Sequence, residues 1–552
     1  MRKNKRGSGL GYGHRKMAVE QLEQRSMLAG NVSVSNVGGN LIIRGDNNDN
    51  AVLVQEIAPL PNTSGHSYAV TGFDFADSPV FLPGFRAGPT VIKGGIDVGG
   101  GTHLIGGIKY DINIDLKKGN DVLAVGNSVD DLLALAEGCG FGLGLGSGSG
   151  SASTPGSAVI TAQQEATDKL TTPLNLIINM GDGNDGVAVI ADVGTSGFLN
   201  GVGASLVINT GNGNDAVAVG NAQGLEIPFS EVSQESPGEI SDATMLSLVI
   251  TTGNGNDNVC ATHFIAFGGV SVVTGNGNDE AHLTHFDAAA VTVNTGAGND
   301  GSPSGDSPIT VFDAEIFVDL NRNNTPDGNE PFGPLTVVTG SGNDLVDVDA
   351  VFAQSIVVDT GSGNDGNNSG EPIEIDNCTV VGNVVLSTGP GNDVAEVLNE
   401  LDEIDAKAGD GIIHGSLIVD LGAGNDQLFL AGDDEFVDLI VRGSLTVNAG
   451  SGNDFVDLAN GTISLITTFS MGQGNDELHI FQSGGGSDVA TLVANGGPGK
   501  DTFRNQLGVN SNGNFGFDGN GVPHIIVRNF EIFESPDDLA TVLASGKKSR
   551  GW

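Results

Sequence analysis

Apolar and polar residues alternate in short runs on either side of a recurring turn sequence, Gly-x-Gly-Asn-Asp. Apolar side chains stand five and three positions before the first glycine, as Leu206 and Ile208 do before the turn at Gly211. The alternation resumes after the turn, as in Val217 and Val219. A period of two on both sides predicts two short strands per repeat, each with one face in a core.

The turn recurs at intervals that predict a solenoid. Eleven copies begin at Gly181, Gly211, Gly253, Gly275, Gly296, Gly340, Gly361, Gly389, Gly422, Gly450 and Gly472. The shortest spacings are 21 and 22 residues, and the longer ones are close to twice that or contain a few inserted residues. One fixed turn per period in the twenties is typical of stacked coils. We therefore predict an all-β, right-handed parallel β-helix of about 21–22 residues per coil, roughly 65–70 Å long between residues 181 and 497 at about 4.8 Å per coil.

Composition shifts divide the chain into five segments. Residues 1–30 form a basic leader, 31–138 are expected to form N-terminal β coils, and 139–165 are a Gly/Ser-rich insertion. The repeat solenoid is predicted over 166–535. Residues 536–552 are predicted to hold a short capping helix, with Ser535 as its N-cap, followed by a basic tail.

Charge and composition exclude several classes of protein. The 23 basic and 68 acidic residues give a formal net charge of −45, which repels nucleic acid and anionic membranes and attracts cations. No run of about 18 apolar residues suggests a membrane span. Cys139, Cys260 and Cys378 are far apart, so no disulfide framework is predicted.

Stacking the coils would place one aspartate per turn in a column. Two carboxylates about 5 Å apart repel by roughly 0.8 kcal/mol in water, and by more at lower dielectric. Carboxylate and glycine carbonyl oxygens are hard ligands that suit Ca²⁺, so we expect several calcium ions along this edge. The expected ligands are Asp185, Asp215, Asp257, Asp279, Asp300, Asp344, Asp365, Asp393, Asp426, Asp454 and Asp476.

The turn resembles the RTX (haemolysin-type) calcium repeat, Gly-Gly-x-Gly-x-Asp-x-apolar-x. Residues 210–218, TGNGNDAVA, match this pattern except at its first glycine. The resemblance implies that the aspartate and the turn carbonyls bind calcium between neighbouring coils; it extends to the glycines Gly211, Gly213, Gly253, Gly255, Gly275 and Gly277. RTX arrays repeat every nine residues with turns on both sides, whereas this chain has one turn per coil. The alternative is a plain tight turn in which Asn and Asp hydrogen-bond to nearby backbone.

A second calcium candidate lies in an insertion between coils. Its potential ligands stand at positions 1, 3, 5, 7, 9 and 12 of an EF-hand-type loop; they are Asp319, Asn321, Asn323, Thr325, Asp327 and Glu330. The flanks are predicted strands, so the segment resembles the calcium loops of β-sandwich repeats in bacterial surface proteins. A loop rich in Asn and Asp without an ion is the alternative.

The N-terminal segment contains a motif that bears on location. Residues 20–29, EQLEQRSMLA, resemble the LEPR-XLL motif near the N-terminus of large bacterial surface and secreted proteins, with Gln24 and Met27 as departures. This resemblance implies an extracellular or cell-surface location; a disordered basic leader is the alternative.

Three histidines form a candidate metal site. His263 and His285 are one coil apart and would stack near His282. They could form a small transition-metal site or a plain ladder of polar side chains.

These observations predict a secreted or cell-surface calcium-binding repeat protein with a structural or adhesive role and no enzymatic activity. Its expected partners are calcium and extracellular polysaccharide or other surface proteins. The alternative is a β-helical carbohydrate-active enzyme, a polysaccharide lyase or hydrolase, which would need acidic and basic residues clustered in a groove. Ice binding is disfavoured because the recurrent threonines before the turns, such as Thr210 and Thr252, have the inward parity.

Overall fold

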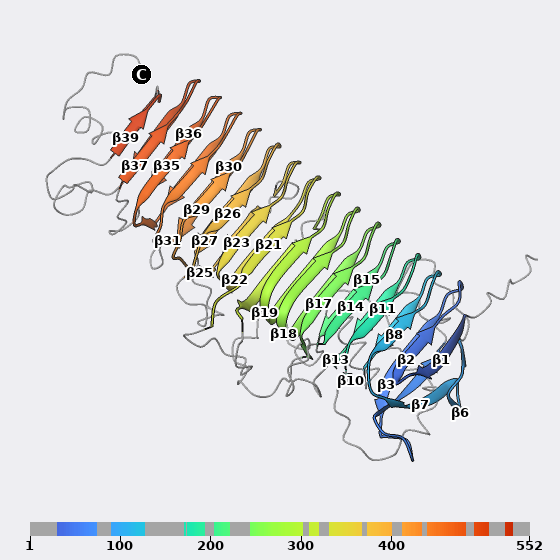
Figure 1. The fold of residues 1–552 in the computed structure, drawn as a ribbon. Coiled ribbons are helices and arrows are strands. Elements are labelled where there is room, and N and C mark those ends of the chain that lie inside the picture. The colour runs from blue at the N-terminus through green and yellow to red at the C-terminus, as the bar shows by residue number, and fades with distance from the viewer. Residues whose placement is uncertain are drawn as a thin grey trace, which may run out of the picture.

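The chain forms a long β-solenoid in the computed structural model (Figure 1). The structure describes residues 30–73, 90–126, 170–172, 174–193, 204–220, 243–301, 309–318, 330–366, 372–399, 411–432, 439–481, 491–506, 525–530 and 532–533. In this part of the chain the regular elements are strands, and parallel pairings join each coil to the next. The predicted all-β parallel solenoid is confirmed. The predicted C-terminal helix, the basic leader and the Gly/Ser-rich insertion lie outside the described residues.

Two parallel sheets run the length of the rod, and a third is described between β16 (Ala243–Met245) and β34 (Gly461–Ile463). The first sheet holds the strand that precedes the Gly-x-Gly-Asn-Asp turn. It consists of β2 (Asn40–Arg44), β8 (Ile112–Asp115), β11 (Leu176–Asn179), β14 (Ser205–Asn209), β17 (Ser247–Thr251), the ends of β18 (Asn258–Val273) and β19 (Glu280–Asn294), β21 (Pro334–Val338), β23 (Ser355–Asp359), β26 (Val384–Ser387), β29 (Leu417–Asp420), β32 (Leu445–Asn448), β35 (Ile466–Ser470), β37 (Thr491–Asn495) and β39 (Ile525–Arg528).

The second sheet holds the strand that follows the turn. It consists of β3 (Ala51–Ile57), β9 (Val122–Val125), β12 (Gly186–Val189), β15 (Ala216–Gly220), the starts of β18 and β19, β20 (Ile309–Ile316), β22 (Val346–Ala353), β24 (Ile373–Asp376), β27 (Val394–Asn399), β30 (Gln427–Gly432), β33 (Phe455–Ala459), β36 (Glu477–Phe481), β38 (Thr502–Gln506) and β40 (Ile532–Phe533).

The third sheet is short and closes the coil. It contains β16 (Ala243–Met245), the middle parts of β18 and β19, the ends of β20 and β22, β25 (Thr379–Val380), β28 (Ile412–Ile413), β31 (Leu439–Val441) and β34 (Gly461–Ile463). Strands β10 (Leu170–Thr172) and β13 (Ala191–Val193) pair with each other in parallel.

The N-terminal end is built differently from the coils. Strands β1 (Asn31–Val37), β4 (His66–Gly72), β6 (Ile96–Gly99) and β7 (Thr102–Ile108) make antiparallel pairs, and β5 (Val91–Lys93) pairs with β1 in parallel. The prediction of coils over 31–138 therefore describes only part of this region, because an alternating strand looks the same whether its partner runs parallel or antiparallel. The antiparallel strands pair with β2 and β3 of the first coil.

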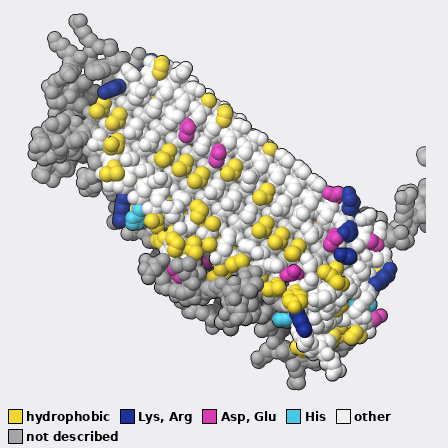
Figure 2. Space-filling model, viewed as in Figure 1, with side chains coloured by type: hydrophobic (Ala, Val, Ile, Leu, Met, Phe, Trp, Pro, Cys, Tyr) yellow, Lys and Arg dark blue, Asp and Glu magenta, His cyan; other side chains and the backbone are white. Residues whose placement is uncertain are grey.

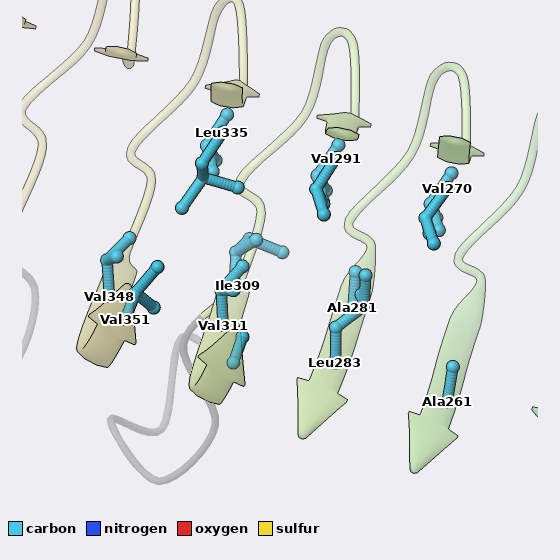
Figure 3. Packing of buried hydrophobic residues seen from close by; sticks show 14 of the residues in the cluster. Ala261, Val270, Ala281, Leu283, Val291, Ile309, Val311, Leu335, Val348 and Val351 are labelled. Carbon is cyan, nitrogen blue, oxygen red and sulfur yellow. The ribbon is translucent and has the colours of Figure 1, made fainter. Parts of the chain in front are cut away.

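The core lies between the sheets and is made of short aliphatic ladders. Val270, Val291 and Leu335 of the first sheet face inward toward residues such as Leu283 and Val311 of the second sheet (Figure 3). The predicted inward residues, including those before and after the turn at Gly211, are buried. This confirms the parity assigned from the alternation. Identical registers in successive coils place each turn above the previous one.

Candidate functional site

The glycines of the turn allow successive turns to stack in close contact. Gly213 and Gly255 have φ values of 149° and 143°, which L side chains rarely adopt. A Cβ added to Gly255 would lie 1.5 Å from the carbonyl oxygen of Gly213 in the previous coil, and one on Gly253 would lie 1.7 Å from the oxygen of Gly211. The glycine spacing is therefore required by the approach of two backbones as well as by the turn itself.

The aspartates that end the turn form one buried ladder. The N–H of Asp215 donates to Oδ1 of Asp257 at 2.8 Å, and the N–H of Asp257 donates to Oδ1 of Asp279 at 2.9 Å. The same bond, from each backbone to the carboxylate one coil further on, joins Asp121, Asp185, Asp215, Asp257, Asp279, Asp300, Asp344, Asp365, Asp393, Asp426, Asp454, Asp476 and Asp501. All eleven predicted aspartates thus lie in one column, at most 2% exposed.

The asparagine before each aspartate forms a second ladder of opposite direction. The N–H of Asn256 donates back to Oδ1 of Asn214 at 2.9 Å, and the N–H of Asn278 donates to Oδ1 of Asn256 at 3.0 Å. Two adjacent residues therefore connect each turn to both of its neighbours. The first copy reverses the pair: Asp49 accepts from the N–H of Asn120, and the N–H of Asn50 donates to Asp121.

Inward-facing threonines, which are not among the predicted ligands, complete part of the aspartate ladder. The Thr252 hydroxyl lies 2.6 Å from Oδ2 of Asp257 and 3.2 Å from the carbonyl oxygen of Thr274 in the next coil. The same pairing, at a constant spacing of five residues, is made by Thr210, Thr252, Thr274, Thr295, Thr339 and Thr360. The constant spacing of five residues between threonine and aspartate is the sequence signal for this hydrogen bond.

Other carboxylates in the ladder have an oxygen without a hydrogen-bond partner. Oδ2 is buried and unpaired in Asp121, Asp185, Asp393, Asp426, Asp454 and Asp476. The residue five positions earlier is apolar in five of these six copies, namely Leu116, Met180, Leu421, Ala449 and Met471. In the remaining copy, the Thr388 hydroxyl donates to the carbonyl oxygen of Leu421 at 2.9 Å. A bare oxygen in such surroundings makes the charged carboxylate costly.

Burial accordingly raises the pKa of the ladder aspartates. The pKa rises to about 6 in Asp215 and to about 7 in Asp257, with desolvation as the largest cause and the threonine hydrogen bond opposing it. In Asp426 and Asp454 burial raises the pKa to about 7, and in Asp185 to about 9. Charge on neighbouring rungs adds to the rise in several copies, among them Asp257 and Asp426. The column therefore favours a bound proton or a cation over free negative charge.

The fit of this column to calcium is partial. Ca²⁺ takes six to eight oxygen ligands, and Oδ1 of each predicted aspartate accepts a backbone N–H from the previous coil. The carbonyl oxygens of Gly253 and Gly275 accept N–H groups of the next turn. The unpaired Oδ2 atoms are the available ligands. Within the described ranges, no group of three or more His, Cys, Asp or Glu residues is arranged to hold a metal ion.

The predicted loop ligands fall mostly beyond the described ranges. Asp319, Asn321, Asn323, Thr325 and Asp327 lie outside the described residues, so the structure does not place them. Glu330 is described and is 8% exposed.

The predicted histidine pair stacks in a corner of the solenoid. The rings of His263 and His285 are parallel within 7°, with centroids 4.8 Å apart, and both residues have positive φ. Burial lowers the pKa of His263 to about 4, with His285 as a second cause. Asp313, Ala350 and Asn377 have positive φ at the same place in later coils, so the strained conformation belongs to the corner. His282 lies on the second sheet, where Nδ1 is 3.4 Å from Oγ1 of Thr310.

Glu477 makes a mixed-charge contact with two basic side chains. Oε1 of Glu477 lies 2.6 Å from Nε2 of His479 and 2.8 Å from a guanidinium nitrogen of Arg504. Glycoside hydrolysis requires a pair of carboxyl groups, whereas this cluster holds one carboxylate between two basic groups.

The described cysteines differ in state. Cys260 is disulfide-bonded, contrary to the expectation that the cysteines form no disulfide, whereas Cys378 is buried and free.

Comparison with known proteins identifies no relative. No protein-family model, curated protein sequence or solved structure matches the chain. Among the described residues there is no helix long and apolar enough to cross a membrane.

Proposed function

We propose that this protein is a secreted or cell-surface structural rod whose stacked turns are stabilised by neutralisation of the aspartate ladder, with calcium as the ion at neutral pH. The observation that carries the proposal is the ladder itself. Its buried carboxylates are in register along the described solenoid, and six of them leave an oxygen atom unpaired. Such a column needs counter-charge or protons before the coils can stack.

The resemblance of the turn to the RTX repeat supports calcium as the ion, and the formal charge of −45 would concentrate divalent cations around the chain. The disulfide at Cys260 supports an oxidising compartment, as expected outside the cytosol. The unpaired Oδ2 atoms would bind the ion, and calcium would supply the positive charge that these copies lack. A structural role follows because the repeated residues serve to join coils.

Calcium-dependent unfolding tests the proposal. At pH 8 we expect saturating Ca²⁺ to raise the melting temperature of the full chain by several degrees over the chelated protein, since a ligand at about 100 times its Kd stabilises by roughly 2.7 kcal/mol. Mg²⁺ should do less, because it requires a stricter octahedral shell. Circular dichroism follows unfolding and calorimetry measures binding. An identical melting temperature with calcium and with chelator would reject calcium.

Matched variants locate the effect. The double variant Asp426→Asn with Asp454→Asn removes two ladder charges and should reduce the calcium-induced rise. The control, Asp359→Asn with Asp420→Asn, removes two charges from exposed positions on the first sheet and should keep it. An equal reduction in both variants would assign the effect to overall charge and reject the ladder as the site.

A further inference from the structure

The outer surface of the first sheet carries a continuous column of uncharged side chains. The registers of successive strands align Ile42, Asn113, Ile177, Val207, Val249, Ser271, Thr292, Thr336, Val357, Val385, Ile418, Thr446, Thr468, Val493 and Ile526. We call this set the central column. It has no charged and no aromatic residue, and apart from Asn113 and Ser271 its members are β-branched. Each is partly or fully exposed, including Ile418 at 37% and Ile526 at 42%.

The positions on either side of the central column are also poor in charge. Charged residues occupy only six described flanking positions, namely Arg44, Asp111, Asp115, Asp359, Asp420 and Arg528. None lies between Asn175 and Val338, where the flanking residues are small, amide or aliphatic. Figure 2 shows the corresponding face of the rod, with rows of hydrophobic side chains and charged groups mainly toward the ends.

We propose that this face is where a second copy of the chain packs, sheet against sheet, in a homodimer. Two chains that each carry a net charge of −45 repel one another. They can approach closely only where both present little charge, and the first sheet provides such a surface. A two-fold interface can be antiparallel, with its axis through the middle rung at Thr336. The uncharged stretch between Asn175 and Val338 then faces the rungs from Thr336 to Thr468 of the other copy, whose only charged flanking residues are Asp359 and Asp420.

The size of the face agrees with a stable dimer. Fifteen rungs about 4.8 Å apart, with three outward residues across each strand, give on the order of 1,000 Å² per copy, against about 800 Å² per partner in a standard interface. Aligned β-sheets pack about 10 Å apart through such β-branched surfaces. A polysaccharide partner is less suited because the central column has no aromatic ring on which a sugar could stack. The dimer does not depend on the proposed calcium role.

Sedimentation velocity on the full chain at about 1–100 μM tests the dimer. We expect a species of twice 56.0 kDa. Its proportion should increase from about 20 to 300 mM NaCl, because salt screens the repulsion between the acidic chains. A monomer at every concentration, or dissociation as salt increases, would overturn the proposal. The measurements use conditions in which circular dichroism shows the folded β signal, so a failure of calcium binding does not affect them.

A matched pair of triple variants identifies the surface. Val249→Glu, Thr336→Glu and Val385→Glu add three negative charges to the central column and should weaken dimerisation about tenfold or more. Asn254→Glu, Ser341→Glu and Ser362→Glu add the same charge at exposed turn positions and should leave the dimer intact. Equal weakening in both, with both variants folded, would show that another surface forms the dimer. So would a dimer unaffected by the column variant.

Discussion

At the scale of single residues, the distinction between Asn and Asp in the turn has a structural reason. Asn214 accepts the N–H of the next coil, whereas Asp257 accepts the N–H of the previous coil and also the hydroxyl of Thr252. The inner position needs two acceptor oxygens where threonine is present, and a carboxylate provides both. An amide would place an NH₂ group against one of these donors. Asparagine is found in the inner column at residue 50, the first rung.

Replacing one ladder threonine tests this pairing. Thr252→Val keeps the volume but removes the donor to Oδ2 of Asp257, so we expect a loss of about 1–2 kcal/mol in the free energy of unfolding and a further rise in the pKa of Asp257. The neighbouring Thr251→Val is the control, because Thr251 faces outward and is partly exposed; it should change stability by less than about 0.5 kcal/mol. Urea unfolding measures both. Equal effects would mean that the hydroxyl of Thr252 contributes nothing specific.

At the scale of the turn and its strands, much of the architecture could be predicted. The period-two alternation predicts which face of each strand is buried, because a shift of one residue would expose every apolar side chain. The constant distance from alternation to turn likewise predicts that the aspartates stack. The sequence does not show the opposite directions of the Asn and Asp ladders, since both residues accept hydrogen bonds equally well. It also does not show that β4 and β7 pair antiparallel, nor how the long insertions fold.

A glycine substitution tests the close stacking of turns. Gly255→Ala would place a methyl group 1.5 Å from the oxygen of Gly213 at a φ of 143°. Because the opposing atom is backbone, the stack must open, and we expect a loss of roughly 3 kcal/mol or more. Gly269→Ala is the control, since its Cβ would meet nothing closer than 3.8 Å. Thermal unfolding compares the two variants. A tolerated Gly255→Ala would show that neighbouring turns are further apart than described.

At the scale of the whole molecule, the ladder makes stability a property of the entire stack. Successive coils contact chiefly their neighbours, as in other solenoids, so a charge in one rung acts on the rungs beside it. Folding would then be completed where protons or cations are available. The low charge of the first sheet, on a chain with a net charge of −45, would direct contacts between copies to that side. The shared stability of the stack and the side on which copies meet both follow from which residue type repeats at each position of the coil.

The pH dependence of unfolding follows from the raised pKa values. In the presence of chelator, ladder aspartates with a raised pKa keep their protons in the folded state up to about pH 6–7; these are Asp215, Asp257, Asp426 and Asp454. In the unfolded chain the same carboxyls have a pKa of about 3.9 and lose their protons at lower pH. The folded state therefore holds more protons over this window. The free energy of unfolding should fall as pH rises from 5 to 8, by up to about 1.4 kcal/mol per pH unit for each carboxyl that titrates only in the folded state.

The opposing contribution from histidine is small. His263, with a pKa of about 4 when folded, acts in the opposite direction below about pH 6.5, and so does His282, whose pKa burial also lowers. These are two groups against many aspartates of the ladder. Urea unfolding at pH 5, 6, 7 and 8 measures the slope. The variant with Asp426→Asn and Asp454→Asn should have a shallower slope, while Asp359→Asn with Asp420→Asn should match the wild type. If the free energy of unfolding instead increases from pH 5 to pH 8 in the presence of chelator, the buried carboxylates are charged in the folded state and other groups stabilise their charge. Calcium should flatten the slope, because an ion that binds the charged ladder stabilises most where the protons have left.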